Sequence, residues 1–435
     1  MNKIIGIRKE DKNRWERRTP LVPEHIQELR KKEKLDFMVQ PSKIRIYSDQ
    51  EFSAVGANLT ENLRECDCVF GIKEMPIDFF QPKKTYIFFA HVIKGQSHNM
   101  PMLKKLLERG CNLIDYEKVA DDKGKRLIFF GHHAGLAGMI DTLWAFGRRL
   151  ENEGIVSPFQ DIRQTIQYEN LAQAKQSIVE AGKKITEEGL HPSLVPLVCG
   201  FTGYGNVSGG AQEIFDLLPF EEIKPKALGE FFAKKNFSKN KLYKLVFREE
   251  DIVEPIAKTE SFELKDYYAH PEKYRSTFER YVPYLTMLVN CIYWDNRYPR
   301  LVTKNFLKLL YKNEPRLRAI GDISCDIEGS IEATVKATSS DNPVFVYDPI
   351  TNRTIDGMVG RGPVIMAVDN LPCEIAKESS LYFGNILKPF VPAIAEADFS
   401  VTFDKCQLPS EIKKAVITYQ GELTPDYKYI TNYLR

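Results

Sequence analysis

The chain has 435 residues, enough for two or three domains that each bury a sizeable core. Hydrophobic residues make up 43% and charged residues 28%, which excludes disordered, collagen-like and coiled-coil chains. The net charge of +2 gives no basic footprint for nucleic acid. The longest apolar runs are far shorter than the ~20 residues that cross a bilayer. The first 18 residues show no secretory signal, so we expect a cytoplasmic protein.

The eight cysteines are scattered, and none belongs to a C-x-x-C pair. We therefore expect reduced thiols and no metal site. Cys199 and Cys291 are interpreted as buried strand residues, with a redox bridge between them as the alternative.

The first third of the chain alternates short apolar runs with helix-length segments. Strands are predicted at residues 4–7, 68–72, 86–90 and 111–114, and a helix at residues 23–32. Runs that are apolar on both faces are typical of a parallel sheet covered on both sides.

Titratable groups follow each of these four runs. They are Arg8, Lys9, Lys73, Glu74, His91, Asp115 and Glu117. One polar residue after a strand usually only begins a loop, but ligands of open α/β sheets bind at the carboxyl ends of strands. Four such ends together predict a functional site.

A helical pattern begins at His133 and is interpreted as the crossing into a second domain. Gly135 and Gly138 are expected to let this helix approach a neighbour closely. A second long helix is predicted at residues 170–188, and it leads to the apolar run at residues 194–199.

After that run the sequence reads GFTGYGNVSGGAQEIF, in which Gly203 and Gly205 stand before a helical pattern. A strand, G-x-G and an amphipathic helix favour a dinucleotide site over a plain strand–turn–helix. The first residues of the helix, Asn206, Val207 and Ser208, are expected at the phosphates, with Ser208 in place of the usual third glycine.

The residue that holds the adenosine ribose is expected about 20 positions after the first glycine. If the second strand ends near Ile223, Lys224 and Lys226 lie at its tip and favour the 2′-phosphate of NADP. If it ends earlier, Glu221 or Glu222 favours NAD.

Residues 227–283 show no clear strand period and are interpreted as an insertion, either a solvated lobe or an oligomer contact. Further strands are predicted at residues 286–293, 319–323 and 364–368.

Several long motifs resemble the lysine–ketoglutarate reductase family. They are IGIRKEDKNRWERRTPLVPEHI, GIKEMP, FFAHVIKGQ, DYEKVADDKGKRLIFFG, GYGNVSGGAQ, NCIYW, GDISCD and VDNLP. The resemblance covers nearly the whole chain; in animals and plants this activity is the N-terminal half of a bifunctional aminoadipic semialdehyde synthase. More distantly, the chain is similar to alanine dehydrogenase and transhydrogenase.

The resemblance implies that L-lysine condenses with 2-oxoglutarate and that NADPH reduces the imine to saccharopine, with NAD as the other possible cofactor. It implies Lys73 and His91 as the acid–base pair, with His91 at the carbinolamine hydroxyl and Lys73 at the amine, or the reverse. Arg18 and Arg126 are implied as carboxylate anchors.

The resemblance implies three further groups of residues. Glu16, Glu117 and Phe130 match its substrate site, and Ser324, Cys325 and Asp326 match its substrate loop. Lys125, Tyr293, Ile323, Val368, Asp369, Asn370 and Leu371 match positions near the nucleotide. Some relatives have arginine where this chain has Lys125.

The fold implied is α/β, with two Rossmann-like, doubly wound parallel-sheet domains flanking a cleft. We expect the first domain over residues 1–132 plus 376–435 and the nucleotide domain over residues 133–375. A separate glutamate-forming saccharopine dehydrogenase is expected to consume the product. The alternatives are an alanine or opine dehydrogenase on the same scaffold and a non-catalytic nucleotide-binding regulator.

Overall fold

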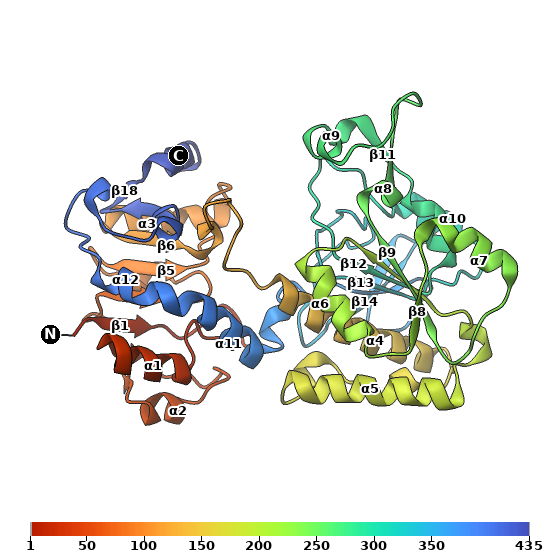
Figure 1. Ribbon diagram of the computed structural model, residues 1–435, viewed down its shortest axis with the longest axis horizontal. Coiled ribbons are helices and arrows are strands. Elements are labelled where there is room, and N and C mark those ends of the chain that lie inside the picture. The colour runs from red at the N-terminus through yellow and green to blue at the C-terminus, as the bar shows by residue number, and fades with distance from the viewer. Residues whose placement is uncertain (1, 435) are drawn as a thin grey trace. The chain divides into compact units, whose positions relative to one another are not determined.

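The computed structural model describes residues 2–434, which fold into two compact units. Unit 1 combines residues 2–130 with residues 376–434, and unit 2 is Gly131–Ile375. Each unit contains a sheet in which most neighbouring strands are parallel (Figure 1). The expected α/β fold with two parallel-sheet domains is confirmed.

The sheet of unit 1 has the order β18-β17-β6-β5-β4-β1-β2-β3. Its strands are β1 (Ile4–Ile7), β2 (Asp36–Val39), β3 (Asn58–Leu59), β4 (Cys68–Phe70), β5 (Thr85–Phe88), β6 (Asn112–Asp115), β17 (Val416–Tyr419) and β18 (Glu422–Leu423). The strands from β6 to β3 run parallel, whereas β17 and β18 add an antiparallel edge.

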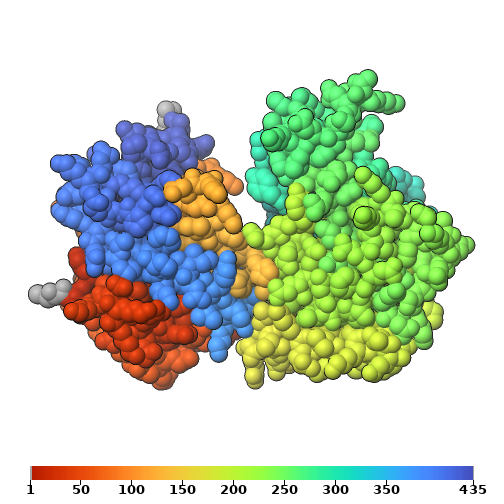
Figure 2. Space-filling model, viewed as in Figure 1, coloured from red at the N-terminus to blue at the C-terminus, as the bar shows by residue number. Residues whose placement is uncertain are grey.

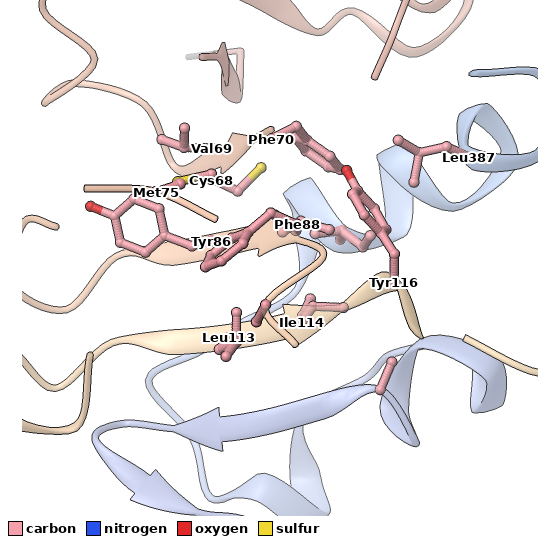
Figure 3. Packing of buried hydrophobic residues seen from close by; sticks show 14 of the residues in the cluster. Cys68, Val69, Phe70, Met75, Tyr86, Phe88, Leu113, Ile114, Tyr116 and Leu387 are labelled. Carbon is pink, nitrogen blue, oxygen red and sulfur yellow. The ribbon is translucent and has the colours of Figure 1, made fainter. Parts of the chain in front are cut away.

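Helices cover this sheet and bury its apolar faces. They are α1 (Pro23–Glu33), α2 (Asp49–Ala54), α3 (Met100–Glu108), α11 (Ala376–Leu387), α12 (Val391–Glu396) and α13 (Ser410–Lys413). Figure 3 shows side chains of β4, β5 and β6 packed together with Tyr116 and with Leu387 of α11. The C-terminal segment thus completes the core of the first unit.

The sheet of unit 2 has the order β15-β14-β16-β13-β12-β7-β9-β8. Its strands are β7 (Val198–Thr202), β8 (Phe220–Glu222), β9 (Leu242–Phe247), β12 (Met287–Asn290), β13 (Ala319–Asp322), β14 (Val344–Asp348), β15 (Arg353–Asp356) and β16 (Val364–Met366). A separate hairpin joins β10 (Val253–Pro255) to β11 (Tyr274–Ser276).

The helices of unit 2 are α4 (Gly131–Asn152), α5 (Leu171–Glu188), α6 (Asn206–Phe215), α7 (Leu228–Lys234), α8 (Glu249–Ile252), α9 (Leu264–Ala269) and α10 (Lys304–Leu310). The Asn170 side chain caps α5 by accepting the backbone N–H of Gln173 at 2.9 Å. In Figure 2, α5 is the yellow band on the outside of unit 2.

Glycines allow α4 to pack closely against its neighbours. A Cβ at Gly135 would lie 1.9 Å from the carbonyl oxygen of Val207 in α6, and one at Gly138 would lie 2.6 Å from Ile323. The close approach expected at these two glycines is confirmed.

The expectation that residues 227–283 form an insertion is wrong. This segment is not simply an insertion, because it supplies β9, which pairs with β7 inside the parallel sheet. The strand beside the glycine-rich strand is therefore β9, whereas β8 is the outer edge strand. The pattern of β9 was obscured by the charged Lys244, whose ammonium is buried against Asp216 at 2.6 Å.

Within residues 2–434, no helix is long and apolar enough to span a membrane.

Candidate functional site

The carboxyl ends of β1, β4, β5 and β6 lie next to one another in the unit 1 sheet, and they carry a cluster of titratable groups. Glu74 follows β4 and His91 follows β5, and Nδ1 of His91 lies 2.7 Å from Oε1 of Glu74. Glu74 also pairs with Lys12 at 3.1 Å. Burial by itself would raise the pKa of Glu74, but His91 and Lys12 outweigh it and hold that pKa well below its usual range.

His91 adopts an uncommon backbone conformation, with φ of +48°. Its carbonyl oxygen accepts a hydrogen bond from Nδ2 of Asn99 at 3.2 Å, and its ring stacks on Phe89 at 6.1 Å. A left-handed conformation is costly for a residue with a Cβ, so it persists where surrounding contacts enforce it.

Lys73 is partly buried beside the same cluster. Burial lowers the pKa of Lys73 below its ordinary value, and the positive charge of Arg18 lowers it further. A lysine with a lowered pKa can lose and regain a proton nearer to neutral pH.

Glu10 is a buried residue of this site that the sequence reasoning missed. Its carboxylate accepts the backbone N–H groups of Ile72 at 2.7 Å and Lys73 at 3.0 Å. Burial, aided by the negative charge of Glu16, raises the pKa of Glu10 to about 7. Because Glu10 stands two residues beyond Arg8 at the end of β1, the strand-end rule could have found it.

Arg18 and Glu16 form a buried bidentate ion pair, with Nε to Oε1 at 2.7 Å and Nη2 to Oε2 at 2.6 Å. The guanidinium also lies 4.3 Å from the centre of the Phe130 ring, which stacks on Phe383 at 5.1 Å. A buried carboxylate thus holds the Arg18 guanidinium against the Phe130 ring.

Arg126 and Glu117 lie beyond the end of β6. Nε of Arg126 donates to the carbonyl of Ile128 at 2.8 Å, and its guanidinium lies 5.4 Å from the Phe89 ring. Oε2 of Glu117 is buried with no hydrogen-bond partner among residues 2–434. The structure thus brings Lys73, His91 and the predicted substrate residues of the first domain to one edge of unit 1.

The glycine-rich turn of unit 2 has the conformation that a phosphate site needs. Gly203 has φ of +84°, and a Cβ there would lie 3.2 Å from Ile292. A Cβ at Gly205 would meet nothing within 4 Å, so space is open before the first N–H groups of α6. These features are compatible with the pyrophosphate of a dinucleotide, the ligand predicted for Gly203, Gly205, Asn206, Val207 and Ser208.

A pocket of about 280 Å³ adjoins this turn. It is lined by the turn, by the ends of β9 and β12 and by tyrosines, among them Tyr204, Tyr268, Tyr293 and Tyr298. Glu249 lines it and accepts the hydroxyl of Tyr268 at 2.6 Å. Arg248, the residue before Glu249, is exposed, and its guanidinium lies 4.6 Å from the centre of the Tyr204 ring.

The predicted substrate loop follows β13. Ser324 donates to the carbonyl of Ile292 at 2.6 Å, and the Cys325 thiol donates to the carbonyl of Ala367 at 3.0 Å. Asp322, at the end of β13, accepts hydrogen bonds from Asn290 at 2.8 Å and Thr334 at 2.6 Å. Burial raises the pKa of Asp322 to about 6.

The remaining predicted nucleotide residues occupy three different places. The first group follows β12, β13 and β16 at the carboxyl edge of the unit 2 sheet, near the glycine turn. It consists of Tyr293, Ile323, Val368, Asp369, Asn370 and Leu371. Asp326 of the predicted substrate loop lies at this edge too. Lys224 and Lys226 lie beyond the edge strand β8, so they do not follow the strand that neighbours β7. Lys125 belongs to unit 1, in a turn where Asp121 accepts its backbone N–H.

No group of three or more potential metal ligands was found in residues 2–434, and all eight cysteines, including Cys199 and Cys291, have free thiols.

Two family models match the chain. The N-terminal domain of alanine dehydrogenase/PNT matches residues 6–137, and the C-terminal domain matches residues 271–426. The fold and these matches define a two-domain protein of the dehydrogenase class. The chain belongs to the alanine dehydrogenase/PNT superfamily. Such domains imply a nicotinamide nucleotide cofactor without distinguishing NAD from NADP.

The chain is also similar to individual curated proteins. The chain is 42% identical, over 99% of its length, to alpha-aminoadipic semialdehyde synthase of Arabidopsis thaliana, and 36% identical over 98% to the mitochondrial enzyme of that name from Rattus norvegicus. It spans 41% and 47% of those two proteins. It is also 26% identical to saccharopine dehydrogenase [NAD(+), L-lysine-forming] of Emericella nidulans, over 81% of the chain and 82% of the relative.

Solved structures support the fold. An L-alanine dehydrogenase superposes with a TM-score of 0.62 at 16% identity, covering 99% of this chain and all of that one. A transhydrogenase from Sinorhizobium meliloti has a TM-score of 0.56 at 14% identity, covering 98% of this chain and all of that one.

Proposed function

We propose that the chain is a lysine–ketoglutarate reductase: it condenses L-lysine with 2-oxoglutarate and reduces the imine to saccharopine with NADPH. The observation that carries this proposal is the cluster of Lys73, His91 and Glu74 beside two arginines at one sheet edge. The similarity to alpha-aminoadipic semialdehyde synthases along nearly the whole chain supports it. The cytoplasmic compartment and the separate enzyme that consumes saccharopine stay predictions.

The cationic groups suit substrates rich in carboxylates. Arg126 offers a guanidinium half-buried against Phe89, and Arg18 lies behind Phe130 with Glu16 as its partner. Planar guanidinium groups bind carboxylates bidentately, and partial burial strengthens each such bond. In this proposal the ammonium of lysine binds Glu117, whose Oε2 has no partner among the described residues.

His91 and Lys73 carry the proton transfers in this proposal. Imine formation removes a proton from the ε-amine of lysine and delivers one to the hydroxyl that leaves the carbinolamine as water. Glu74 accepts Nδ1–H of His91, which leaves Nε2 to exchange the proton at the hydroxyl. Lys73, whose pKa is lowered by burial and by Arg18, exchanges the proton of the amine. The opposite division between the two residues is the alternative.

Residues 203–208 would hold the cofactor's pyrophosphate, and NADPH, when bound, supplies the hydride that reduces the imine. We assign the ribose position to the end of β9 in this proposal, because β9 neighbours β7. Arg248 directly follows β9, and its guanidinium beside Tyr204 is suited to a 2′-phosphate. Glu249 is already hydrogen-bonded by Tyr268. We therefore propose NADPH, with Arg248 in the role expected of Lys224 or Lys226.

The test is NADPH oxidation with lysine plus 2-oxoglutarate, compared with each substrate alone, with pyruvate plus ammonium, and with NADH. Oxidation that requires both lysine and 2-oxoglutarate supports the proposal, and product analysis should find saccharopine. Oxidation with pyruvate plus ammonium would transfer the function to an alanine dehydrogenase. A tight NADPH complex with no turnover in any mixture would indicate a nucleotide-binding regulator.

A further inference from the structure

The C-terminal segment of unit 1 contacts the loop that carries His91. This segment is the helical stretch Pro425–Tyr433, which follows β18 and lies near the C-terminal end in Figure 1. The hydroxyl of Tyr429 donates to the carbonyl of Ile93 at 2.7 Å. The Tyr433 ring covers Gly95, since a Cβ at Gly95 would lie 2.4 Å from that ring.

The contacted loop needs such support. His91 has φ of +48° and Gly95 has φ of +68°, so the chain turns sharply twice within five residues. Inside the loop, the N–H of Gly95 donates to Val92 at 3.0 Å, while Asn99 donates to His91. The contacts from Tyr429 and Tyr433 come from more than 300 residues away along the chain.

The segment itself is firmly anchored. Ile430 is fully buried, Tyr427 is 4% exposed, and the Tyr427 hydroxyl donates to the carbonyl of Lys414 at 2.7 Å. The opposite face leaves Tyr429 and Tyr433 about half exposed, toward the loop. Buried residues therefore anchor the segment in unit 1, and two of its aromatic side chains contact the loop.

The same segment approaches the end of β6. The ammonium of Lys118 lies 5.9 Å from the Tyr427 ring. Burial raises the pKa of Tyr429, with Tyr433 next in effect and then the charge of Glu117. The segment thus contacts the His91 loop through Tyr429 and approaches the turn after β6 through Tyr427.

We propose that Tyr429 and Tyr433 are positioning residues: they hold the His91 loop in the conformation that presents the imidazole to Glu74 and to substrate. The expected effect on kcat rests on the proposed function, whereas the restraint on the loop does not depend on it. Since neither tyrosine directly contacts the imidazole, their effect acts through the loop backbone.

The experiment compares Tyr429→Phe and Tyr433→Ala with the wild type. The matched control is Tyr419→Phe, which removes a tyrosine hydrogen bond to a backbone carbonyl, that of Val401 at 2.9 Å, elsewhere in unit 1. Hydrogen–deuterium exchange of residues 91–96 reports the loop directly, whether or not the enzyme turns over. Steady-state kinetics with lysine, 2-oxoglutarate and NADPH report the consequence.

We expect Tyr429→Phe and Tyr433→Ala to speed exchange of residues 91–96 and to lower kcat about 3- to 10-fold, with KM for NADPH unchanged. Tyr433→Phe, which keeps the ring over Gly95, should restore most of the activity, and Tyr419→Phe should leave exchange at residues 91–96 unaltered. Unchanged exchange in both test variants overturns the inference. Faster exchange without any wild-type turnover supports the loop restraint and contradicts only the proposed function.

Discussion

Glu74 and His91 face each other across the ends of two neighbouring strands, with Oε1 and Nδ1 2.7 Å apart. A carboxylate that accepts Nδ1–H fixes the tautomer and the orientation of the ring. We expect Glu74→Gln to lower kcat at least about 10-fold, because an amide can present either its oxygen or its NH2 group to the ring and therefore fixes no single tautomer. The measurement is steady-state turnover with saturating substrates.

A surface carboxylate provides the control for Glu74. Glu61 pairs with Lys9 at 2.9 Å and is 64% exposed, so Glu61→Gln should leave turnover unchanged. If Glu74→Gln keeps full activity, the carboxylate does not orient the imidazole during catalysis.

Lys73 should behave differently from an exposed lysine. We expect Lys73→Met to lower kcat about 100-fold or more, because the amine that exchanges a proton is removed. KM for NADPH should not change, since Lys73 lies in unit 1 and the glycine turn in unit 2. The comparison variant is Lys32→Met, because the side chain of Lys32 is 67% exposed and pairs with Glu28. Equal turnover in the two variants would show that Lys73 takes no part in proton transfer.

The sequence predicted the parallel strands of the first unit well because their apolar runs are buried on both faces. Residues 4–7 match β1, and the predicted strands at 68–72, 86–90 and 111–114 differ from β4, β5 and β6 by at most two residues at either end. The same rule failed at β9, where Lys244 interrupts the apolar run. That lysine is buried because Asp216 neutralises it, a pairing that no local pattern reveals.

The candidate site was predictable where function follows strand ends, and not where contacts are remote in sequence. Lys73 and His91 follow strands, so their convergence follows from a parallel sheet. Glu10 binds the backbone of the β4 loop, and Tyr429 binds the His91 loop, from 62 and 336 residues away along the chain. Such contacts depend on tertiary structure.

The position of Arg248 makes cofactor preference testable. We expect Arg248→Ala to raise KM for NADPH roughly 10-fold while KM for NADH stays constant, because a charge-assisted bond to the 2′-phosphate is lost. The measurement is initial rate against each nucleotide. Lys224→Ala and Lys226→Ala serve as comparisons. If Lys226→Ala shows the selective loss and Arg248→Ala does not, the ribose position was assigned to the wrong residue.

A buried carboxyl pair should make unit 2 less stable as pH rises. Glu374 and Asp141 are both buried, and Asp141 accepts the backbone N–H of Thr165 at 2.7 Å. Burial, and then the charge of Asp141, raises the pKa of Glu374 well above its ordinary value, and burial also raises the pKa of Asp141. The folded state therefore keeps protons on this pair at a higher pH than the unfolded state does, so the pair's contribution to stability falls as pH rises.

We expect Glu374→Gln to raise the Tm at pH 8, because a neutral amide replaces a buried carboxyl whose ionisation at that pH opposes folding. The gain should shrink as the pH falls from 8 toward 4, because the folded wild type then takes up protons on this pair. Thermal unfolding of both proteins across this pH range is the measurement, with the exposed Glu187→Gln in α5 as control. If the Tm difference between the two proteins does not vary with pH, ionisation of the pair does not lower the stability of the folded state.

The contact between α4 and α6 provides a stability test beside the phosphate turn. A Cβ at Gly135 would lie 1.9 Å from the carbonyl of Val207 and 2.7 Å from the backbone nitrogen of Ala211, and neither backbone atom can move without shifting α6. We expect Gly135→Ala to destabilise unit 2 by about 1–3 kcal/mol or more. Because α6 begins at the glycine-rich turn, the proposed phosphate site predicts that NADPH affinity falls as well.

Gly209 is the matched control in the same helix as Val207. A Cβ there meets nothing within 4 Å, and Gly209 is exposed within α6. Gly209→Ala should therefore stabilise the protein by about 0.5–1 kcal/mol, because alanine loses less backbone entropy on folding. Chemical denaturation of both variants gives the sign of each effect. If the Gly135→Ala variant is as stable as the Gly209→Ala variant, α4 and α6 can move apart without a loss in the free energy of unfolding. Their close packing would then not fix the glycine-rich turn.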